Sequence, residues 1–316
     1  MSKLVRYAAA RLDSERAFAL PSLPIGNIAA MTITIKRVGI VGSGIMGSGI
    51  AEVAARAGHE VILRSRSQDT ADAMVAGLHK SLAKQVDRGK LDAAERDTIA
   101  GLVSATTDLT ALADADLVIE SVVEDLAVKK ALIAELDGIV QPHAILATNT
   151  STLPVVEIAM ATTRPDKVVG VHFFNPAPAM SLVEVVRPLT ASDDTVTAAL
   201  EFATACGKNP VEVKDRAGFI VNHLLFPYLN NAVRMRENGT ASRDHIDEAM
   251  KGGCNFPMGP LALLDLVGLD TSVAILDALH AEFGDPNYST VPLLRRMLAA
   301  GQLGRKSGSG FYDYRK

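Results

Sequence analysis

The sequence predicts an α/β domain built on a doubly wound, mostly parallel sheet, followed by a smaller all-α domain. From Lys36 onward, short apolar runs rich in Val and Ile alternate with segments in which apolar residues recur at helical spacing, which is the pattern of parallel strands joined by crossover helices. After Gly218 the strand-like runs stop, and apolar residues recur at helical spacing as far as Gly301. A length of 316 residues also fits two domains.

The predicted strands span 37–41, 60–64, 117–121, 144–148, 167–174, 182–187 and 210–214. Near-continuous Val and Ile in these runs fit strands that are buried on both faces of a sheet. A helix is expected over 68–88, after the second strand. The first helix of the all-α part covers 220–239 and contains Pro227, which we expect to kink or interrupt it, because proline lacks the N–H that a helix interior needs.

A glycine-rich turn lies between the first strand and the helical run that follows it. Gly42, Gly44 and Gly47 form the pattern G-x-G-x-x-G, with Ile45 and Met46 between the last two. In this setting the first glycine permits a tight turn, the second lets backbone approach a pyrophosphate and the third lets helix pack on strand. A simple turn with packing glycines is the alternative, but the strand–turn–helix context favours dinucleotide binding on a Rossmann-type sheet.

The end of the second predicted strand bears on the choice of dinucleotide. Arg64, Ser65 and Arg66 stand there in place of the carboxylate that usually hydrogen-bonds the ribose 2′-hydroxyl of NAD. Two guanidinium groups beside a serine can hold a 2′-phosphate through charge-assisted hydrogen bonds, so the sequence slightly favours NADP over NAD. The alternative is that both arginines are solvated and that Asp69 reaches back to the ribose.

Composition and charge exclude several classes of protein. With 48% hydrophobic and 22% charged residues the chain is not disordered as a whole, and its net charge of −4 offers no basic field to nucleic acid or to an anionic membrane. Cys206 and Cys254 lie outside any C-x-x-C pair, which favours a reducing, cytoplasmic location. Apolar stretches are too interrupted for a membrane span, and the histidines show no ligand pattern, so we expect no metal.

Polar residues mark three further segments: Asn149 and Ser151 follow the fourth predicted strand, His172 lies near the end of the fifth, and Asn222 lies in the first helix of the all-α part. Ligands of open α/β sheets bind at the carboxyl ends of strands, so Ser151 and His172 should face a bound nicotinamide. Their segments are TNTSTLP (148–154), HFFNPAPAMSLVEVV (172–186) and GFIVNHLLFPYLNNA (218–232), joined by GSGIMGSGIA (42–51), VIESVVEDLAVK (118–129), FPMGPLALLDLVGLD (256–270) and GRKSGSGFYDY (304–314).

Together these segments resemble the L-3-hydroxyacyl-CoA dehydrogenase family, most closely its single-function 3-hydroxybutyryl-CoA members, from about residue 36 to the end. The resemblance implies that His172 is the catalytic acid/base and that Glu184 pairs with it. Such a pair suits oxidation of an alcohol, because a base must take the hydroxyl proton as hydride leaves the same carbon. Ser151 and Asn222 then hydrogen-bond and orient the substrate.

The resemblance also implies binding residues. Cofactor contacts fall on Glu124, Lys129 and Asn149, and more weakly on Lys306, while coenzyme A contacts fall on Ser81 and on Arg88, where the family has lysine. It divides the chain into an extension of unknown role (1–35), a dinucleotide-binding domain (36–216) and a helical C-terminal substrate and dimerisation domain (217–316). For the extension, an upstream start codon or a loosely docked arm is favoured over a targeting peptide.

The implied function is the interconversion of a (3S)-3-hydroxyacyl-CoA, most simply 3-hydroxybutyryl-CoA, and the 3-oxoacyl-CoA with NAD or NADP, in fatty-acid or butanoate metabolism, by a homodimer. One alternative is the same chemistry on an acyl carrier protein. A second is the β-hydroxyacid dehydrogenase group, which needs a helix lysine, whereas no lysine occurs between Lys214 and Lys251. A third is a non-catalytic dinucleotide-binding sensor or structural protein, against which the intact set of four catalytic-type residues argues.

Overall fold

The structure is a computed structural model that describes residues 33–315; residues 1–32 of the expected extension and residue 316 lie outside this range. The strands are β1 (Arg37–Val41), β2 (Glu60–Arg64), β3 (Val103–Thr106), β4 (Leu117–Glu120), β5 (Ile145–Thr148), β6 (Val168–Phe173), β7 (Leu182–Arg187) and β8 (Asn209–Lys214). The helices are α1 (Ile45–Arg56), α2 (Gln68–Asp87), α3 (Ala93–Gly101), α4 (Leu126–Asp137), α5 (Val155–Ala159), α6 (Asp193–Ala205), α7 (Val221–Glu237), α8 (Arg243–Cys254), α9 (Pro260–Val267), α10 (Leu269–Phe283) and α11 (Pro292–Ala299). Short 3-10 turns are η1 (Leu109–Leu112), η2 (Pro165–Lys167), η3 (Pro286–Tyr288) and η4 (Arg305–Ser307).

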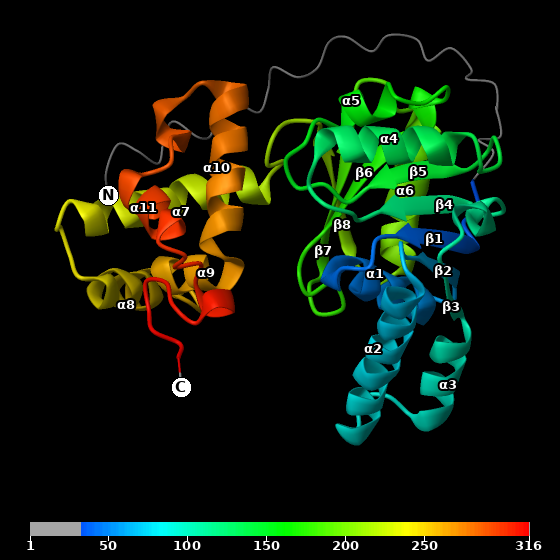
Figure 1. Cartoon of the computed structure of the whole chain (residues 1–316), viewed down its shortest axis with the longest axis horizontal. Helices are drawn as coiled ribbons and strands as arrows, with labels where there is room; N and C mark the ends of the chain where they lie inside the picture. The colour runs from blue at the N-terminus through cyan, green and yellow to red at the C-terminus, as the bar shows by residue number, and fades with distance from the viewer. Residues whose placement is uncertain (1–32, 316) are drawn as a thin grey trace, which may run out of the picture. The chain divides into compact units, whose positions relative to one another are not determined.

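Within the described range one sheet holds eight strands in the order β3-β2-β1-β4-β5-β6-β7-β8 (Figure 1). All neighbouring strands are parallel except β6 and β7, which are antiparallel. The order reverses at β1, whose neighbours β2 and β4 lie on opposite sides, and open sheets of this kind bind ligands at that reversal. The predicted doubly wound, mostly parallel fold is confirmed.

The strand β3 is absent from the sequence prediction. Its residues, Val-Ser-Ala-Thr, are half-buried or exposed at the edge of the sheet and pair only with β2. An edge strand with two polar side chains shows no continuous apolar run, so its pattern cannot be distinguished from that of a loop. It forms because the helical pair α2 and α3, which lie side by side (Figure 1), returns the chain beside β2.

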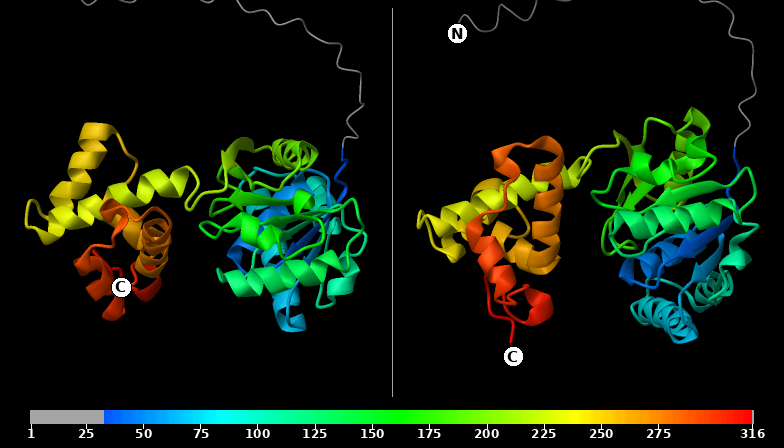
Figure 2. Two further views of the ribbon diagram at one scale, coloured as in Figure 1. Left: turned by 90° about the horizontal axis from the view of Figure 1, so that it is seen from above. Right: turned by 45° about the horizontal axis from the view of Figure 1, so that its top comes forward.

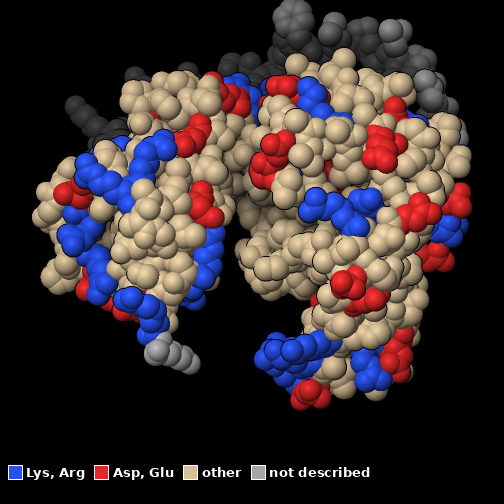
Figure 3. Space-filling model, in the orientation of Figure 1, with Lys and Arg blue, Asp and Glu red and all other residues tan. Residues whose placement is uncertain are grey.

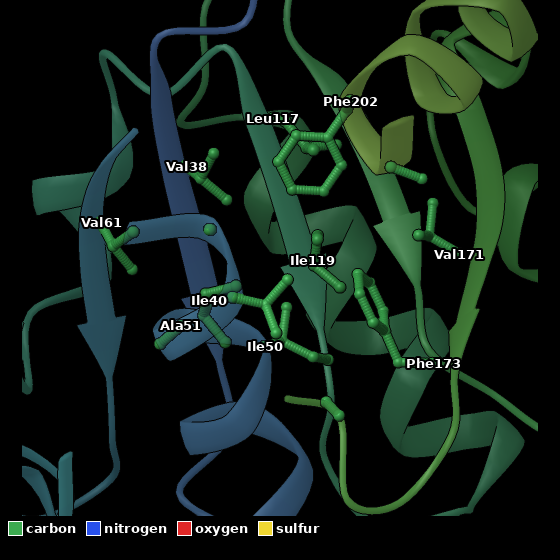
Figure 4. Packing of buried hydrophobic residues seen from close by; sticks show 14 of the residues in the cluster. Val38, Ile40, Ile50, Ala51, Val61, Leu117, Ile119, Val171, Phe173 and Phe202 are labelled. Atoms are coloured by element: carbon green, nitrogen blue, oxygen red, sulfur yellow. The ribbon is translucent and has the colours of Figure 1, made fainter. Parts of the chain in front are cut away.

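Side chains of the central strands alternate between the two faces of the sheet, and helices cover both faces (Figure 2). Val38, Ile40 and Ile119 pack with residues of α1 and α6 on one face, where Phe173 and Phe202 complete the cluster (Figure 4). The other face packs against η1, α4 and α5. Burial on both faces explains why these strands read as near-continuous Val and Ile.

The helical region from α7 to α11 has an apolar cluster of its own, contributed by α7 through α11 and by Phe311. Of the two effects expected of Pro227, the interruption is wrong, because α7 is continuous from Val221 to Glu237 with Pro227 inside it, while the kink stays a prediction. Proline removes one backbone hydrogen bond from a helix. The buried face of α7, which includes Phe226, Pro227 and Leu229, packs in this cluster and holds the helix together despite that loss.

Charged residues of both signs are interspersed over the face of the molecule shown in Figure 3. Cys206 and Cys254 are free thiols, and burial raises the pKa of the Cys206 thiol to about 12, so it stays protonated near neutral pH. None of the helices between residues 33 and 315 combines the length and the apolar character that a membrane crossing requires.

Candidate functional site

The glycine-rich turn joins β1 to α1 at the point where the strand order reverses. Gly42 has a φ of +135°, and a Cβ there would lie 2.2 Å from the carbonyl oxygen of Ser121. A Cβ on Gly47 would lie 2.2 Å from the carbonyl oxygen of Gly42. Both positions therefore require glycine so that turn, helix and β4 can approach one another.

Gly44 differs from the other two glycines, because a Cβ there would meet no protein atom within 4 Å. It borders a cavity of about 780 Å³ whose wall contains four of the five predicted residues of the turn, Gly42, Gly44, Ile45 and Met46. Helix α1 begins at Ile45 without a side-chain cap, so its first N–H groups can serve an anion. The exposed backbone at Gly44 and the free N–H groups at the start of α1 together fit the pyrophosphate of a dinucleotide.

We expect Gly44→Val to weaken dinucleotide binding while the fold is kept. The side chain would enter the open side of the turn, where the ligand is expected and where an added Cβ has no protein atom within 4 Å. Fluorescence titration should show the Kd for NADH or NADPH rising at least about tenfold, equal to roughly 1.4 kcal/mol. Gly252→Ala, in α8 and also free of close neighbours, is the matched control. An unchanged Kd in Gly44→Val would show that the glycine turn is not part of the dinucleotide-binding site.

The last residue of β2 and the two that follow it line the same cavity: Arg64, Ser65 and Arg66. Ser65 is only 2% exposed and its hydroxyl hydrogen-bonds that of Thr70. Arg64 donates from Nε to the Thr107 carbonyl oxygen at 3.3 Å, which leaves its two terminal nitrogens for a ligand. Asp69, the alternative partner of the ribose, is not among the residues that line the cavity.

His172 and Glu184 lie opposite each other on the antiparallel strands β6 and β7. The His172 Nδ1 and Glu184 Oε2 atoms are 2.8 Å apart, and both side chains are buried. The imidazole ring also contacts two aromatic rings, those of Phe174 at 4.5 Å and Phe219 at 5.5 Å between centroids. A buried carboxylate on Nδ1 fixes the tautomer, so that Nε2 carries the lone pair.

The second carboxylate oxygen of Glu184 holds the start of α7. Oε1 accepts hydrogen bonds from the backbone N–H groups of Ile220 at 2.9 Å and Val221 at 3.0 Å. Asn222, the next residue, is 8% exposed. Phe219, just before them, has a φ of +47°, a left-handed conformation that is unfavourable for a bulky side chain. One carboxylate thus connects the histidine to the helix that carries Asn222.

The segment from Thr148 to Ser151 leaves the carboxyl end of β5 beside this pair. The Ser151 N–H donates to Glu124 Oε1 at 2.9 Å, and the Thr150 hydroxyl donates to the same oxygen at 2.5 Å. Asn149, which lines the cavity, accepts at Oδ1 from the N–H of Phe173 at 2.8 Å. Since Phe173 follows His172, the serine segment and the histidine strand are directly linked.

Two residues that the resemblance assigns to the cofactor form ion pairs within the protein and do not line the large cavity. The Lys129 ammonium is buried against Glu120 and Glu124 and is not among the residues lining the large cavity. Lys306 forms an ion pair with Asp270 in the helical region and does not line that cavity either. The cofactor contacts of Lys129 and Lys306 stay predictions.

The residues assigned to coenzyme A lie on α2. Ser81 lines a second cavity of about 420 Å³ next to the glycine turn, together with Pro176, Ala177 and Pro178. Its hydroxyl donates to the buried Glu52 at 2.8 Å. Arg88 caps the far end of α2, is exposed, and is not among the residues lining this cavity.

Sequence reasoning missed two polar residues of the large cavity. Asn175 and Ser121 both line it, although neither was assigned a role. Each stands just past the carboxyl end of a strand, β6 and β4 respectively, which is the position at which ligand contacts gather in this fold. That placement is the signal by which Asn175 and Ser121 could have been found.

Two family models match the chain. The one described as "3-hydroxyacyl-CoA dehydrogenase, NAD binding domain" matches residues 37–216, and the one described as "3-hydroxyacyl-CoA dehydrogenase, C-terminal domain" matches 218–314. The 3-hydroxybutyryl-CoA dehydrogenase of Mycobacterium tuberculosis is 51% identical over 286 residues, which cover 90% of this chain and 100% of that protein. Human mitochondrial hydroxyacyl-coenzyme A dehydrogenase is 42% identical over 90% of this chain and 93% of its own.

A solved structure shows the same architecture. The crystal structure of (S)-3-hydroxybutyryl-CoA dehydrogenase from Ralstonia eutropha has a TM-score of 0.87 and 42% identity, covering 90% of this chain and 100% of that chain. Matches over both the strand-containing and the helical regions agree with the resemblance that the sequence motifs indicate. The chain therefore belongs to the 3-hydroxyacyl-CoA dehydrogenase family.

Proposed function

We propose that this protein is an NAD(P)-dependent dehydrogenase that interconverts a short-chain (3S)-3-hydroxyacyl-CoA, such as 3-hydroxybutyryl-CoA, and the 3-oxoacyl-CoA. The observation that carries the proposal is the buried pair of His172 and Glu184, placed in a chain of this family beside a cavity suited to a dinucleotide. A bound nicotinamide dinucleotide accepts or supplies the hydride.

The proposed proton chemistry follows from the geometry of this pair. Glu184 accepts the Nδ1–H of His172 at 2.8 Å, which leaves Nε2 to take the substrate's hydroxyl proton during oxidation and to return it during reduction. The buried carboxylate also stabilises the imidazolium that forms when His172 takes the proton. Phe174 and Phe219 hold the ring in place and exclude water from its faces.

The proposed positioning groups come from two elements. Ser151 ends the segment that is linked to β6, and Asn222 lies in the first turn of α7. In their proposed roles both hydrogen-bond the reacting oxygen of the substrate and stabilise charge that develops on it. Ser81 and Arg88, on α2, are the proposed contacts of the coenzyme A portion, and Asn175 joins Asn149 as a proposed cofactor contact because both line the large cavity.

The preferred cofactor in this proposal is NADP. The support is the wall of the large cavity, which contains Arg64 and Arg66 but, among the described residues, no carboxylate that could accept from a ribose 2′-hydroxyl. The terminal nitrogens of Arg64 and the exposed guanidinium of Arg66 suit a 2′-phosphate. An NADP preference places the enzyme in the reductive direction, with acetoacetyl-CoA as its substrate.

The test of this function compares initial rates of acetoacetyl-CoA reduction with NADPH and with NADH. We expect turnover with both and a higher kcat/KM for NADPH. In the double variant Arg64→Gln/Arg66→Gln the value for NADPH should fall about 10- to 100-fold, as expected for lost charge-assisted hydrogen bonds of about 1.5–3 kcal/mol, while the value for NADH changes less than about twofold.

An NADH advantage in the wild type would overturn the NADP proposal and return the enzyme to oxidative fatty-acid or butanoate metabolism. Activity on a carrier-protein-bound acetoacetyl group, but not on acetoacetyl-CoA, would replace the CoA substrate with the carrier-bound one. Dinucleotide binding without turnover of either substrate would favour a sensor.

We further propose a cytoplasmic homodimer that associates through the helical domain, residues 217–316. Exposed apolar side chains in this region support such an interface: Leu224, Met235, Phe256 and Leu266.

The free thiols of Cys206 and Cys254 suit a reducing compartment such as the cytoplasm. The division at residues 216 and 217 is supported by the separate apolar clusters of the sheet and of the helical region.

A further inference from the structure

The segment that follows β6 borders both cavities beside the glycine turn. Asn175, at its start, lines the large cavity, whereas residues 176–178 line the second cavity, which also contains Ser81. Residues 176–180, Pro-Ala-Pro-Ala-Met, form a short loop before β7, and we call it the proline loop. The position of the proline loop therefore sets the shape of the cavity in which the coenzyme A portion of the substrate is proposed to bind.

Side-chain packing holds the proline loop mainly at Ala177. This residue is buried in the apolar cluster of the sheet, and a Cβ added to Gly49 of α1 would lie 3.2 Å from the Ala177 Cβ. The other four residues of the loop are exposed. Within the loop, the Pro176 carbonyl oxygen accepts hydrogen bonds from the N–H groups of Ala179 at 3.0 Å and Met180 at 3.1 Å. These two bonds fold the loop on itself and do not join it to the sheet.

Lys208, which lies between α6 and β8, joins the proline loop to the sheet. Its Nζ donates to the carbonyl oxygen of Ala177 at 2.7 Å and to that of Met180 at 2.8 Å. No backbone N–H of the described residues donates to either oxygen. Hydrogen bonds from a charged donor are about twice as strong as those between neutral groups. One ammonium group therefore binds the backbone of the loop at two places, near its start and at its end.

The surroundings of Lys208 strengthen this hold on the loop. The residue is 8% exposed, and burial lowers the pKa of its ammonium group. The titratable groups near it are the Cys206 thiol and the Arg56 guanidinium, with no carboxylate among them. A buried charge is stable only where polar groups compensate for the lost water. The two carbonyl oxygens of the proline loop provide this compensation, so the charge and the loop position stabilise each other.

We propose that Lys208 is a positioning residue for substrate binding: its ammonium holds the proline loop in the place where residues 176–178 form the wall of the second cavity, and it acts through the loop rather than by contact with the ligand. This inference rests on the proposed function and on the proposed place of coenzyme A beside Ser81. A loop that occupies the correct position for only a fraction of the time raises the apparent Kd of the substrate by the inverse of that fraction.

The test uses Lys208→Met, which keeps the length of the side chain and removes its charge and its donors. At saturating NADPH we expect the KM for acetoacetyl-CoA to rise at least about tenfold, with kcat within about threefold of the wild type. Such a split indicates lost binding that the ground state and the transition state share. The NADPH Kd from fluorescence titration should stay within about twofold. Lys214→Met, at the exposed end of β8, is the matched control and should change none of these quantities.

Two further variants keep the test decisive if Lys208→Met folds poorly. Lys208→Gln has a neutral amide that can donate to one of the two carbonyl oxygens, so its KM should lie between those of the wild type and Lys208→Met. Lys208→Arg keeps the charge and the donors and should return KM to within about threefold of the wild type. An unchanged KM in Lys208→Met or Lys208→Gln, whatever the melting temperature, would show a purely structural lysine and would overturn the proposal.

A second substrate separates action through the loop from direct contact with a phosphate of coenzyme A. Acetoacetyl-pantetheine lacks the phosphate groups, and displacement of the loop should raise its KM in Lys208→Met by a factor similar to that for acetoacetyl-CoA. A rise confined to acetoacetyl-CoA would show direct contact and would overturn the inference. Failure of the proposed function would appear instead as a wild-type protein that does not turn over acetoacetyl-CoA. An active wild type with an unchanged KM in Lys208→Met would reject only the role of Lys208.

Discussion

Replacement of His172 by alanine should reduce kcat for acetoacetyl-CoA reduction by about 10³-fold or more. The variant loses the Nε2 atom that transfers the proton, and general acid–base catalysis of this kind contributes roughly 10²–10⁴-fold. It also leaves Glu184 without the histidine as a partner at 2.8 Å. Stopped-flow or steady-state rates at saturating substrate and NADPH measure the effect.

Cofactor binding provides the control for this experiment. The large cavity contains the glycine turn and Asn149, but His172 is not among its lining residues, so the NADPH Kd of His172→Ala should stay within a fewfold of the wild type. A rate close to the wild-type rate would refute the acid/base assignment of His172 and would favour a non-catalytic dinucleotide-binding sensor.

Replacement of Glu184 by alanine should damage both stability and turnover. The buried carboxylate accepts hydrogen bonds from His172, Ile220 and Val221, and its removal leaves these donors unpaired. We expect the free energy of unfolding to fall by about 3 kcal/mol, since hydrogen bonds to a charged group contribute roughly 1.5–3 kcal/mol and unpaired buried donors add a penalty. Urea denaturation and steady-state rates measure the two effects.

The variant Glu184→Gln separates the two roles of this side chain. Its amide oxygen can still accept from Ile220 and Val221 at the start of α7, so the loss of stability should stay below about 1.5 kcal/mol. Its amide nitrogen would face His172 Nδ1 as a donor and favour the wrong tautomer, so kcat should still fall at least about 10²-fold. A Glu184→Gln variant with wild-type kcat would show that the carboxylate does not orient the histidine.

The sequence alone predicts most of the fold, because its periodicities reflect burial directly. Strands covered by helices on both faces are buried at nearly every position and are therefore mostly apolar, as β1, β4, β5 and β6 show. The sequence also predicts the glycine turn. A Cβ added at position 42 or 47 would lie 2.2 Å from a backbone oxygen, so only glycine fits there. The edge strand β3 and the continuity of α7 through Pro227 cannot be predicted from the sequence pattern, because the packing of distant elements decides them.

For the site, the sequence determined which chemical groups are present, and the resemblance of its motifs indicated the pair of His172 and Glu184. Only the tertiary structure decided what each charged group contacts. It paired Lys129 with Glu120 and Glu124, paired Lys306 with Asp270, and gave Glu184 a second role at the start of α7. Such contacts join residues far apart along the chain, and a charge is stable only where burial and partners allow it, so no local pattern encodes them.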